Sequence, residues 1–388
     1  MKRGSTPLLL GLALLFAFSS AGCGQTSASE SSQKTLEIAA DHTPLARALG
    51  LAASQSYLIC DDRFNQLLIV TYDTEKQNPS EGGRDQANST YYDRFVQYDL
   101  NTQLVLKTFP IEKFGFIASA AFAFDGFVYS YMAETEPETW DVALFYQPIE
   151  GEQAPRRVAD IPTGTPFASG PTLSRCGENV VFGYGDYGDS FALNVLTPDF
   201  TVSPLLSFPW RTLEGTEWIT DDFRTSDAHF AYPVGRDGQV VFYVGQMGQE
   251  PVQIALPKGE KLYAFDIADD QLLVSRTNQT AGGTFCIERL DLTGASLEVY
   301  ETDMQYQGIC LNDLSQFCVF GANLPLGVFA IVQNAIQPVD VDTTFLASTW
   351  NLVLSNGADF ILASQSPNEY PDIWRISLKS SPAAPSPS

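Results

Sequence analysis

The motif that decides the fold is plainest in residues 119–131, which read SAAFAFDGFVYSY. Two short apolar runs flank Asp125 and Gly126, and an aspartate–glycine pair between such runs is typical of a β-hairpin turn. Comparable units occur at 57–72, 170–184, 228–245, 262–275, 308–321 and 351–364. Their turns lie near Phe64, Asp125, Gly177, Asp237, Asp270, Leu314 and Gly357, at a mean interval of about 49 residues. We expect each unit to be the first hairpin of a repeated β element.

A second hairpin follows some of these units. Residues 95–109 read FVQYDLNTQLVLKTF, and residues 286–300 read CIERLDLTGASLEVY. An Asp-Leu-x-Thr or Asp-Leu-Thr-Gly core separates the two runs in each case. In such turns we expect Asp and Thr oxygens to accept hydrogen bonds from nearby backbone N–H groups, while Gly supplies a positive φ. The repeat is therefore predicted to be four-stranded and the fold all-β, with a short helix expected only within 42–53.

These stretches resemble the blades of bacterial surface β-propellers of the YncE/TolB-like and PQQ-like kinds. The resemblance implies a single β-propeller, and the seven hairpins predict seven four-stranded blades. Residues 372–378 look like the third strand of the last blade, with only a Pro/Ser segment after them. Residues 35–40 could supply its fourth strand, so we expect an N-terminal strand to close the ring. The resemblance indicates a fold and not a function.

The first 23 residues look like a targeting signal. Lys2 and Arg3 precede an apolar run from Leu8 to Phe18, which is too short to span a bilayer, and small residues then lead to Cys23. This order resembles the bacterial lipoprotein signal, in which cleavage falls before the cysteine and the thiol is lipidated. We therefore expect residues 1–22 to be a signal peptide, and more than one acyl chain on Cys23 to hold the protein stably.

The remaining organisation follows from composition. Residues 23–35 are expected to be the lipidated cysteine and a flexible Ser-rich tether, residues 36–379 the β-propeller domain, and residues 380–388 a disordered Pro/Ser tail. No later run is apolar enough to cross a membrane. The predicted location is the cell membrane or cell surface, lipid-anchored on the extracytoplasmic side.

The charge excludes some classes of partner. The chain has 46 acidic and 22 basic side chains and a formal net charge of −24, which loss of Lys2 and Arg3 would take to −26. Such acidity argues against nucleic acid as a partner, because phosphate binding requires an excess of Lys and Arg. It also works against docking on an anionic lipid surface. A hydrophobic content of 44% is too high for a disordered chain.

Nucleophilic catalysis has little support in the sequence. The chain has only 2 histidines, His42 close to the predicted tether and His229 at the start of an apolar run, and no G-x-S-x-G motif occurs. A peptidase built on a propeller would also need a separate α/β domain, for which we find no pattern. We therefore expect no catalytic triad.

Two acidic loops that contain tryptophan are candidate ligand contacts. Carboxylates can hold sugar hydroxyls while an aromatic ring stacks on the sugar, and two carboxylates at a suitable separation could hydrolyse a glycosidic bond. The alternative is that both loops are solvated surface. The candidate residues are Glu136, Glu138 and Trp140 in the first loop and Glu217, Trp218 and Asp221 in the second.

The remaining candidates concern metal and disulfide. Asp186 and Asp189 form an oxygen-rich turn that could hold a structural calcium ion, although the EF-hand spacing is missing. No other cofactor is expected. Cys310 and Cys318 flank the turn at Leu314 and could form a cross-strand disulfide, or they could be two buried thiols.

The interpretation that best fits these observations is a membrane-anchored, extracytoplasmic binding or scaffold module without catalytic activity. Its partner would be a protein, a peptide or a glycan. One alternative is a carbohydrate-active hydrolase or lyase that uses paired carboxylates on propeller loops. Another is a structural subunit of an envelope complex, which predicts a large exposed apolar patch.

Overall fold

The computed structural model describes residues 36–63, 65–76, 90–136, 139–162, 171–186, 190–209, 218–219, 222–268, 270–278, 284–312, 318–323, 326–332, 335–339, 351–356, 359–364 and 373–380. The compact unit that contains them runs from Leu36 to Ser380, one residue beyond the predicted end of the propeller domain. Within this described part the chain is all-β apart from a short helix, α1 (Leu45–Ala48), which falls inside the predicted helical stretch. None of the described helical residues forms a helix long and apolar enough to cross a membrane.

The described strands form seven antiparallel sheets. The first three are β2 (Gln55–Arg63), β3 (Gln66–Asp73), β4 (Thr90–Asp99), β5 (Leu104–Gly115); β6 (Ala120–Ala123), β7 (Gly126–Glu136), β8 (Thr139–Pro148), β9 (Arg156–Asp160); and β10 (Thr172–Cys176), β11 (Asn179–Asp186), β12 (Ser190–Leu196), β13 (Val202–Pro209). In each of these sheets, strands that follow one another along the chain are hydrogen-bonded neighbours.

The other four sheets follow the same order with two variations. They are β14 (Trp218–Ile219), β15 (Arg224–Thr225), β16 (His229–Arg236), β17 (Gln239–Gln246), β18 (Val252–Ala255); β19 (Leu262–Ala268), β20 (Gln271–Asn278), β21 (Thr284–Asp291), β22 (Ser296–Thr302); β23 (Tyr306–Leu311), β24 (Cys318–Asn323), β25 (Leu326–Val332), β26 (Ala335–Val339); and β27 (Asn351–Asn356), β28 (Asp359–Ser364), β29 (Ile373–Ser380), β1 (Leu36–Thr43). Both β14 and β15 pair with β16, and the last sheet takes its outermost strand from the start of the unit.

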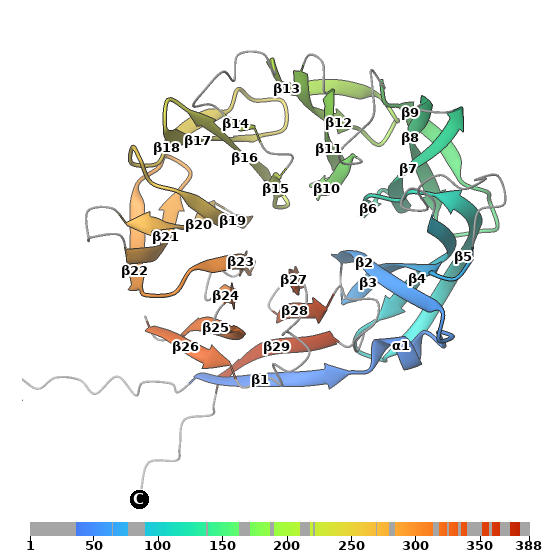
Figure 1. Ribbon diagram of the computed structural model, residues 1–388, viewed down its shortest axis with the longest axis horizontal. Helices are drawn as coiled ribbons and strands as arrows, with labels where there is room; N and C mark the ends of the chain where they lie inside the picture. The colour runs from blue at the N-terminus through green and yellow to red at the C-terminus, as the bar shows by residue number, and fades with distance from the viewer. Residues whose placement is uncertain are drawn as a thin grey trace, which may run out of the picture. The chain divides into compact units, whose positions relative to one another are not determined.

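The sheets are arranged radially, and each places one short edge strand towards the centre (Figure 1). We call β2, β6, β10, β15, β19, β23 and β27 the inner strands, and β5, β9, β13, β18, β22 and β26 the outer strands. Each inner strand contacts the next one along the chain, and β27 contacts β2. This sheet order and these contacts identify a single all-β β-propeller.

The last sheet joins both ends of the compact unit. Strand β1 pairs antiparallel with β29 from Leu36 opposite Ser380 to Thr43 opposite Ile373. The His42 ring lies 4.8 Å from the Trp374 ring across this pair. The expected N-terminal strand is therefore present, at 36–43 rather than 35–40.

One hairpin was assigned to the wrong position in its repeat. The unit at 228–245 is not a first hairpin, because β16 and β17 are the second and third strands of their sheet. The inner position is taken by β15, which contacts both β10 and β19. This strand has two residues and therefore too few to show an apolar run in the sequence.

The predicted turn chemistry is confirmed for aspartate. The Asp99 carboxylate accepts hydrogen bonds from the backbone N–H groups of Asn101 (2.9 Å) and Thr102 (2.7 Å). In the equivalent turn Asp291 accepts from Thr293 N–H at 2.9 Å, and Gly294 has a φ of 88°. The threonine hydroxyls differ from the expectation, because they donate to these carboxylates instead of accepting.

The cores lie between neighbouring sheets. Between the β2–β5 sheet and the β6–β9 sheet, the ring of Phe127 lies 4.8 Å from that of Phe95 and 5.2 Å from that of Phe109, and all three are buried. Polar contacts join the inner strands as well. The Ser119 hydroxyl accepts from the backbone N–H of Leu173 at 3.2 Å and donates to its carbonyl. Each sheet is therefore held by its neighbours.

A buried ion cluster fastens the β19–β22 sheet. Arg276 on β20 donates to Glu288 on β21 at 2.8 Å and pairs with Glu260, which precedes β19. The three side chains are 8%, 9% and 3% exposed, respectively. Removing Arg276 would leave the desolvated carboxylates of Glu260 and Glu288 without their cation.

Replacement of Arg276 by methionine should lower the free energy of unfolding by about 3–5 kcal/mol, the usual cost of breaking a buried ion pair from one side. Urea unfolding of the full chain followed by tryptophan fluorescence measures this loss.

The matched control is Arg157→Met, because Arg157 pairs with Asp141 while both side chains are more than 40% exposed. The Arg157→Met change should lower the free energy of unfolding by less than about 1 kcal/mol. Equal losses for the two variants would show that the buried cluster adds nothing beyond a surface pair.

Candidate functional site

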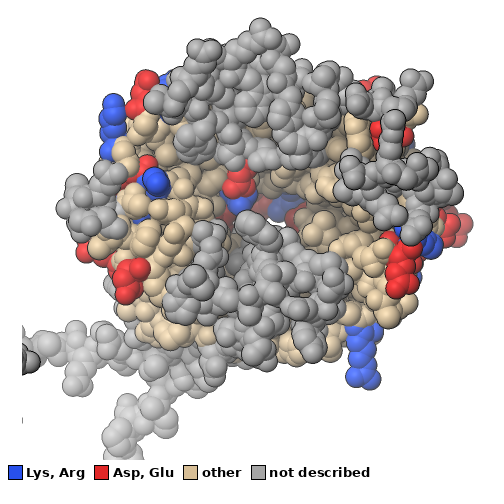
Figure 2. All heavy atoms as spheres, viewed as in Figure 1, with Lys and Arg blue, Asp and Glu red and all other residues tan. Residues whose placement is uncertain are grey.

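Charged side chains gather at the centre of the propeller, where acidic and basic atoms lie between the surrounding sheets (Figure 2). We use the name central ion network for two sets of charged residues on the inner strands or beside them. The first set, whose charges interact with one another, is Asp61, Arg63, Arg175 and Asp227, and the second is Asp222, Arg224 and Asp266.

Asp61 on β2 binds the neighbouring inner strand. Its carboxylate accepts the backbone N–H of Phe122 on β6 at 2.6 Å. Protein encloses the carboxyl group, although water still reaches part of the residue. Desolvation raises the pKa of Asp61 to about 6. The backbone hydrogen bonds and the charges of Arg175 and Arg63 act in the opposite direction, because they lower this pKa.

Asp266 repeats this arrangement on β19. Its carboxylate accepts the backbone N–H of Leu311 on β23 at 2.7 Å, and desolvation raises the pKa of Asp266 to about 6. Both aspartates lie on inner strands and face a leucine of the second strand, Leu68 and Leu273 respectively. The same residue type therefore joins the inner strands at two places in the propeller.

The arginines of the network are placed between these acids. Arg175 on β10 pairs with Asp227 at 2.6 Å, and Arg224 on β15 pairs with Asp222. Desolvation and the nearby Arg175 charge lower the pKa of Arg63. The network thus contains both signs of charge, and two of its carboxylates hold backbone amides. Its geometry fits a structural role better than acid–base catalysis.

The thiols of Cys60, Cys176 and Cys286 are poor nucleophiles. Desolvation raises the pKa of Cys60 and Cys176 to about 12 and that of Cys286 to about 11. A thiol with such a pKa is protonated at neutral pH, and the thiolate is the reactive form. His229 lies at the start of β16, as the sequence indicates, and its Nε2 is 2.8 Å from the Gln246 side-chain nitrogen.

The first acidic loop corresponds to the β7–β8 hairpin. Trp140 is half-buried and packs against the core between the β6–β9 and β10–β13 sheets, so its ring is only partly available for stacking on a sugar. Asp141 accepts two hydrogen bonds from Arg157, at 2.7 and 2.9 Å, and these lower its pKa. An aspartate held ionised in this way is a poor general acid.

Other predicted site residues lie outside the described residues, wholly or by their side chains. Glu138, Asp189, Glu217 and Asp221 are not described, and of Glu136, Asp186 and Trp218 only the backbone is described, in β7, β11 and β14. The predicted carbohydrate and calcium sites therefore stay predictions. Among the described residues, no group of three or more His, Cys, Asp or Glu side chains is arranged to hold a metal ion.

The cysteine pair of the β23–β24 hairpin is offset by one position. The register places Val319 opposite Cys310 and Leu311 opposite Cys318. The side chain of Cys318 lies outside the described residues, so the disulfide also stays a prediction.

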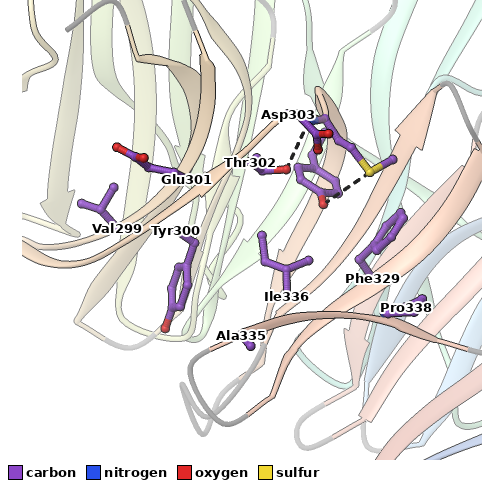
Figure 3. A pocket seen from close by; sticks show the side chains of 11 residues that line it. Val299, Tyr300, Glu301, Thr302, Asp303, Phe329, Ala335, Ile336 and Pro338 are labelled. Carbon is purple, nitrogen blue, oxygen red and sulfur yellow. Dashed lines mark hydrogen bonds between the residues drawn. The ribbon is translucent and has the colours of Figure 1, made fainter. Parts of the chain in front are cut away.

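A groove opens at the outer ends of two neighbouring sheets (Figure 3). We call it the rim groove; its volume is about 600 Å³, and it lies between outer strand β22 and outer strand β26. Tyr300, Phe329 and Ile336 are partly buried around it, while Glu301 and Asp303 are exposed. The Phe329 ring packs edge-on against Tyr306 at 5.6 Å. An apolar floor beside two carboxylates can bind a ligand that carries both apolar and cationic groups.

The sequence analysis identified neither the contacts that Asp61 and Asp266 make with the next inner strand nor the rim groove. An aspartate directly after an apolar run in an inner strand, as in Ile59-Cys60-Asp61 and Ala264-Phe265-Asp266, is the signal that could have identified the aspartate contacts. No comparable signal marks the rim groove, because its walls come from segments about 30 residues apart that meet only in the folded protein.

Comparison with known proteins supports no family assignment. No protein-family model matches the sequence, and no curated protein matches it. Among solved structures, the chain is similar to a prolyl endopeptidase, with a TM-score of 0.49 and 11% identity over 83% of this chain and 55% of that chain. It is also similar to prolyl oligopeptidase B from Galerina marginata, with a TM-score of 0.49 and 11% identity over 82% of this chain and 48% of that chain. A third similar structure is the Cps50 (Swd1) β-propeller domain from Myceliophteria thermophila, with a TM-score of 0.45 and 11% identity over 85% of this chain and 97% of that chain. The chain thus spans about half the length of the two peptidases, and similarity at this identity concerns the fold alone.

The two enclosed aspartates predict a specific pH dependence. Their folded pKa of about 6 lies above the unfolded value of about 4, so the folded state binds more protons between these pH values. The contribution of these two groups to the free energy of unfolding should therefore fall as the pH rises from 4 to 6. Asp61→Asn with Asp266→Asn should remove this fall and stabilise the protein at pH 7 by about 1–2 kcal/mol.

Urea unfolding of the full chain at pH 4.5, 5.5 and 7 tests this prediction. Asp237→Asn, at an exposed turn between β16 and β17, is the control and should leave the wild-type pH dependence unchanged. Parallel stability curves for the wild type and the double variant would contradict the assignment.

Proposed function

We propose that this chain is an extracytoplasmic lipoprotein, held to a membrane by acyl chains on Cys23, whose β-propeller is a non-catalytic binding or scaffold module for a protein partner. The anchoring part of the proposal is supported by Lys2, Arg3 and the apolar run that ends before Cys23. A propeller on a polar tether would display its surfaces away from the lipid.

The observation that carries the binding role is the position of the exposed large apolar side chains. Among the described residues they concentrate on outer strands: Leu104, Val105 and Leu106 on β5, Val202 on β13, Val252 on β18, and Leu297 and Val299 on β22. Isolated exposed apolar residues are ordinary, but Leu104 and Leu106 lie two positions apart on an outermost strand, where alternate side chains share one face. Leu104 and Leu106 are 61% and 48% exposed.

A protein partner suits this surface better than a glycan. Outermost strands can pair with an extended segment of another chain, and apolar side chains beside such a strand add burial. Sugar recognition instead needs exposed aromatic rings and free polar groups. Of the sequence-predicted sugar contacts, the described ring, Trp140, is partly buried in the core.

We further propose that the seven sheets are the blades of one closed ring. The contact between β27 and β2 supports this, as does the pairing of β1 with β29. Arg375 on β29 adds a polar link, because it donates to Asn101 and Asn65 around the first sheet at 2.9 and 3.1 Å. A closed ring would present a rigid set of outer strands to a partner.

Cys23→Ser should release the protein from the membrane, because the thioether that carries the acyl chains cannot form. The measurement is incorporation of radiolabelled palmitate together with fractionation of cell membranes after a high-salt wash.

Ser27→Ala, a change in the same predicted tether, serves as the control and should stay labelled and membrane-bound. Palmitate labelling that persists in the Cys23→Ser protein would overturn the anchor.

A photoreactive phenylalanine analogue placed at position 104 should cross-link one discrete partner on intact source cells. Substitution of Val105 and Leu106 by serine in the same chain should reduce this adduct at least tenfold, because it removes the apolar contact area.

The control position is Asp237, which is exposed on a turn rather than on an outer strand. No adduct at position 104, or adducts of equal yield at 104 and 237, would contradict a docking role for the outer strands.

A further inference from the structure

We propose that a pocket beside helix α1 binds a small organic acid through its carboxylate. We call it the α1 pocket; its volume is about 330 Å³, at the lower end of the range for small-molecule sites. It is lined by Thr43, Pro44, Arg47, Ala48, Tyr98 and Gln103. None of these residues lies on an outer strand, so the site does not depend on the proposed docking of a protein there.

The walls of the α1 pocket are held by the core beneath it. Leu45 and Leu49, four residues apart, are buried in the core shared by the last and the first sheet, and Tyr98 on β4 belongs to the same core. Arg47 and Ala48 lie between the two leucines in sequence and are exposed. The packing of α1 against the first sheet therefore sets the position of both exposed residues beside Tyr98.

Arg47 gives the α1 pocket a positive charge. It is the only charged residue among those that line the pocket, and no ion pair joins it to another residue in the described part of the chain. A guanidinium carries five N–H donors in a planar fork that matches the two oxygens of a carboxylate. In a chain with 46 acidic and 22 basic side chains, this arginine is left for an anion from outside.

The acidic residues close in sequence to the lining residues do not line the pocket themselves. The Asp99 carboxylate accepts hydrogen bonds from the backbone of its own turn, at Asn101 and Thr102. Asp41 lies opposite Arg375 in the β1–β29 pair. The lining thus contains a cation and no acid, which favours a negatively charged ligand.

Two hydroxyl groups add hydrogen-bonding capacity to this charge. Tyr98 is fully buried, and its hydroxyl bonds none of the described residues. Burial raises the pKa of Tyr98, so the phenol stays protonated at neutral pH and can donate to a carboxylate oxygen. Thr43 is 8% exposed and supplies a second hydroxyl. A buried donor without an acceptor is unfavourable, so a ligand oxygen that meets the Tyr98 hydroxyl would stabilise the folded protein.

Gln103 supplies an amide where glycine would be less strained. Its φ is 57°, in the left-handed region, and the equivalent turn of the β19–β22 sheet has Gly294 with a φ of 88°. The amide can donate to the same carboxylate as Arg47. The ring of Pro44 and the methyl group of Ala48 leave an apolar side for the body of the acid.

The test uses the full chain purified in detergent and benzoate as the probe. Saturation-transfer NMR should detect binding of benzoate, with detergent alone as the blank. Benzamide, which is neutral, and benzylamine, which is cationic, should bind about tenfold more weakly because neither can pair with Arg47.

Three variants locate the binding at the α1 pocket. Arg47→Gln removes the charge and should weaken benzoate binding about tenfold. Tyr98→Phe removes only the hydroxyl and should weaken binding about fivefold without lowering the melting temperature of the free protein, since that hydroxyl bonds no described residue. Gln103→Gly should also weaken binding, while relief of the positive φ leaves the melting temperature unchanged or higher.

The matched control is Lys258→Gln, which removes one cation from an exposed position between β18 and β19 and should leave the affinity for benzoate unchanged. Equal effects of Lys258→Gln and Arg47→Gln, or equal binding of benzoate and benzamide, would overturn the proposal. A short peptide that ends in a free phenylalanine carboxylate distinguishes the source of the acid. Tighter binding of this peptide than of benzoate would reject a small free acid and assign the pocket to the end of a chain.

Discussion

The pairing of β1 with β29 is the contact on which the last sheet of the propeller depends. It joins the first described strand of the chain to the last, and Leu36 lies opposite Ser380. Bringing such distant segments together costs loop-closure entropy, but this cost grows only with the logarithm of the chain length. The backbone pairing along the whole of β1 and the contact between the His42 and Trp374 rings offset this entropy cost. The last sheet is complete only when both ends of the unit are in place.

Charge inside the propeller serves mainly to hold its parts together. Asp61 and Asp266 each accept a backbone N–H from the next inner strand, and Arg276 holds two buried glutamates. A buried carboxylate that is hydrogen-bonded to backbone amides joins two strands without needing a specific partner side chain. The cost appears in the raised pKa of the two aspartates, which makes stability depend on pH. Charged residues at the centre of a propeller are therefore no sign of catalysis by themselves.

Among the described residues, the exposed large apolar side chains lie mainly on the outer strands. The described outer strands carry exposed apolar side chains, and one interface between sheets opens into a groove with an apolar floor and an acidic edge. With 46 acidic and 22 basic residues, the chain has few cations. Lys107 and Arg156 make two of their contacts between neighbouring sheets.

Local pattern was sufficient to predict the all-β class, the position of most first hairpins, the aspartate turns at Asp99 and Asp291, and a strand near the N-terminus that joins the last sheet. The hairpins and turns can be recognised from residues that lie within about fifteen positions of one another. The N-terminal strand could be predicted because the last repeat lacks a fourth strand and the start of the domain has one to spare. The short inner strand β15 escaped the pattern because two residues cannot show a periodicity. The sequence also indicated candidate sites only where residues of interest lie close together along the chain, as in the loop that contains Trp140.

Only the tertiary structure decided which polar groups meet. Asp61 contacts Phe122, and Asp266 contacts Leu311, across 61 and 45 residues of sequence. The rim groove likewise exists because β22 and β26 come from different sheets. In a propeller the local hairpin pattern specifies each sheet, but the spaces between sheets depend on how side chains from separate repeats fill them. Composition and periodicity carry no record of that packing, so the strands could be derived from the sequence and the surfaces available for binding could not.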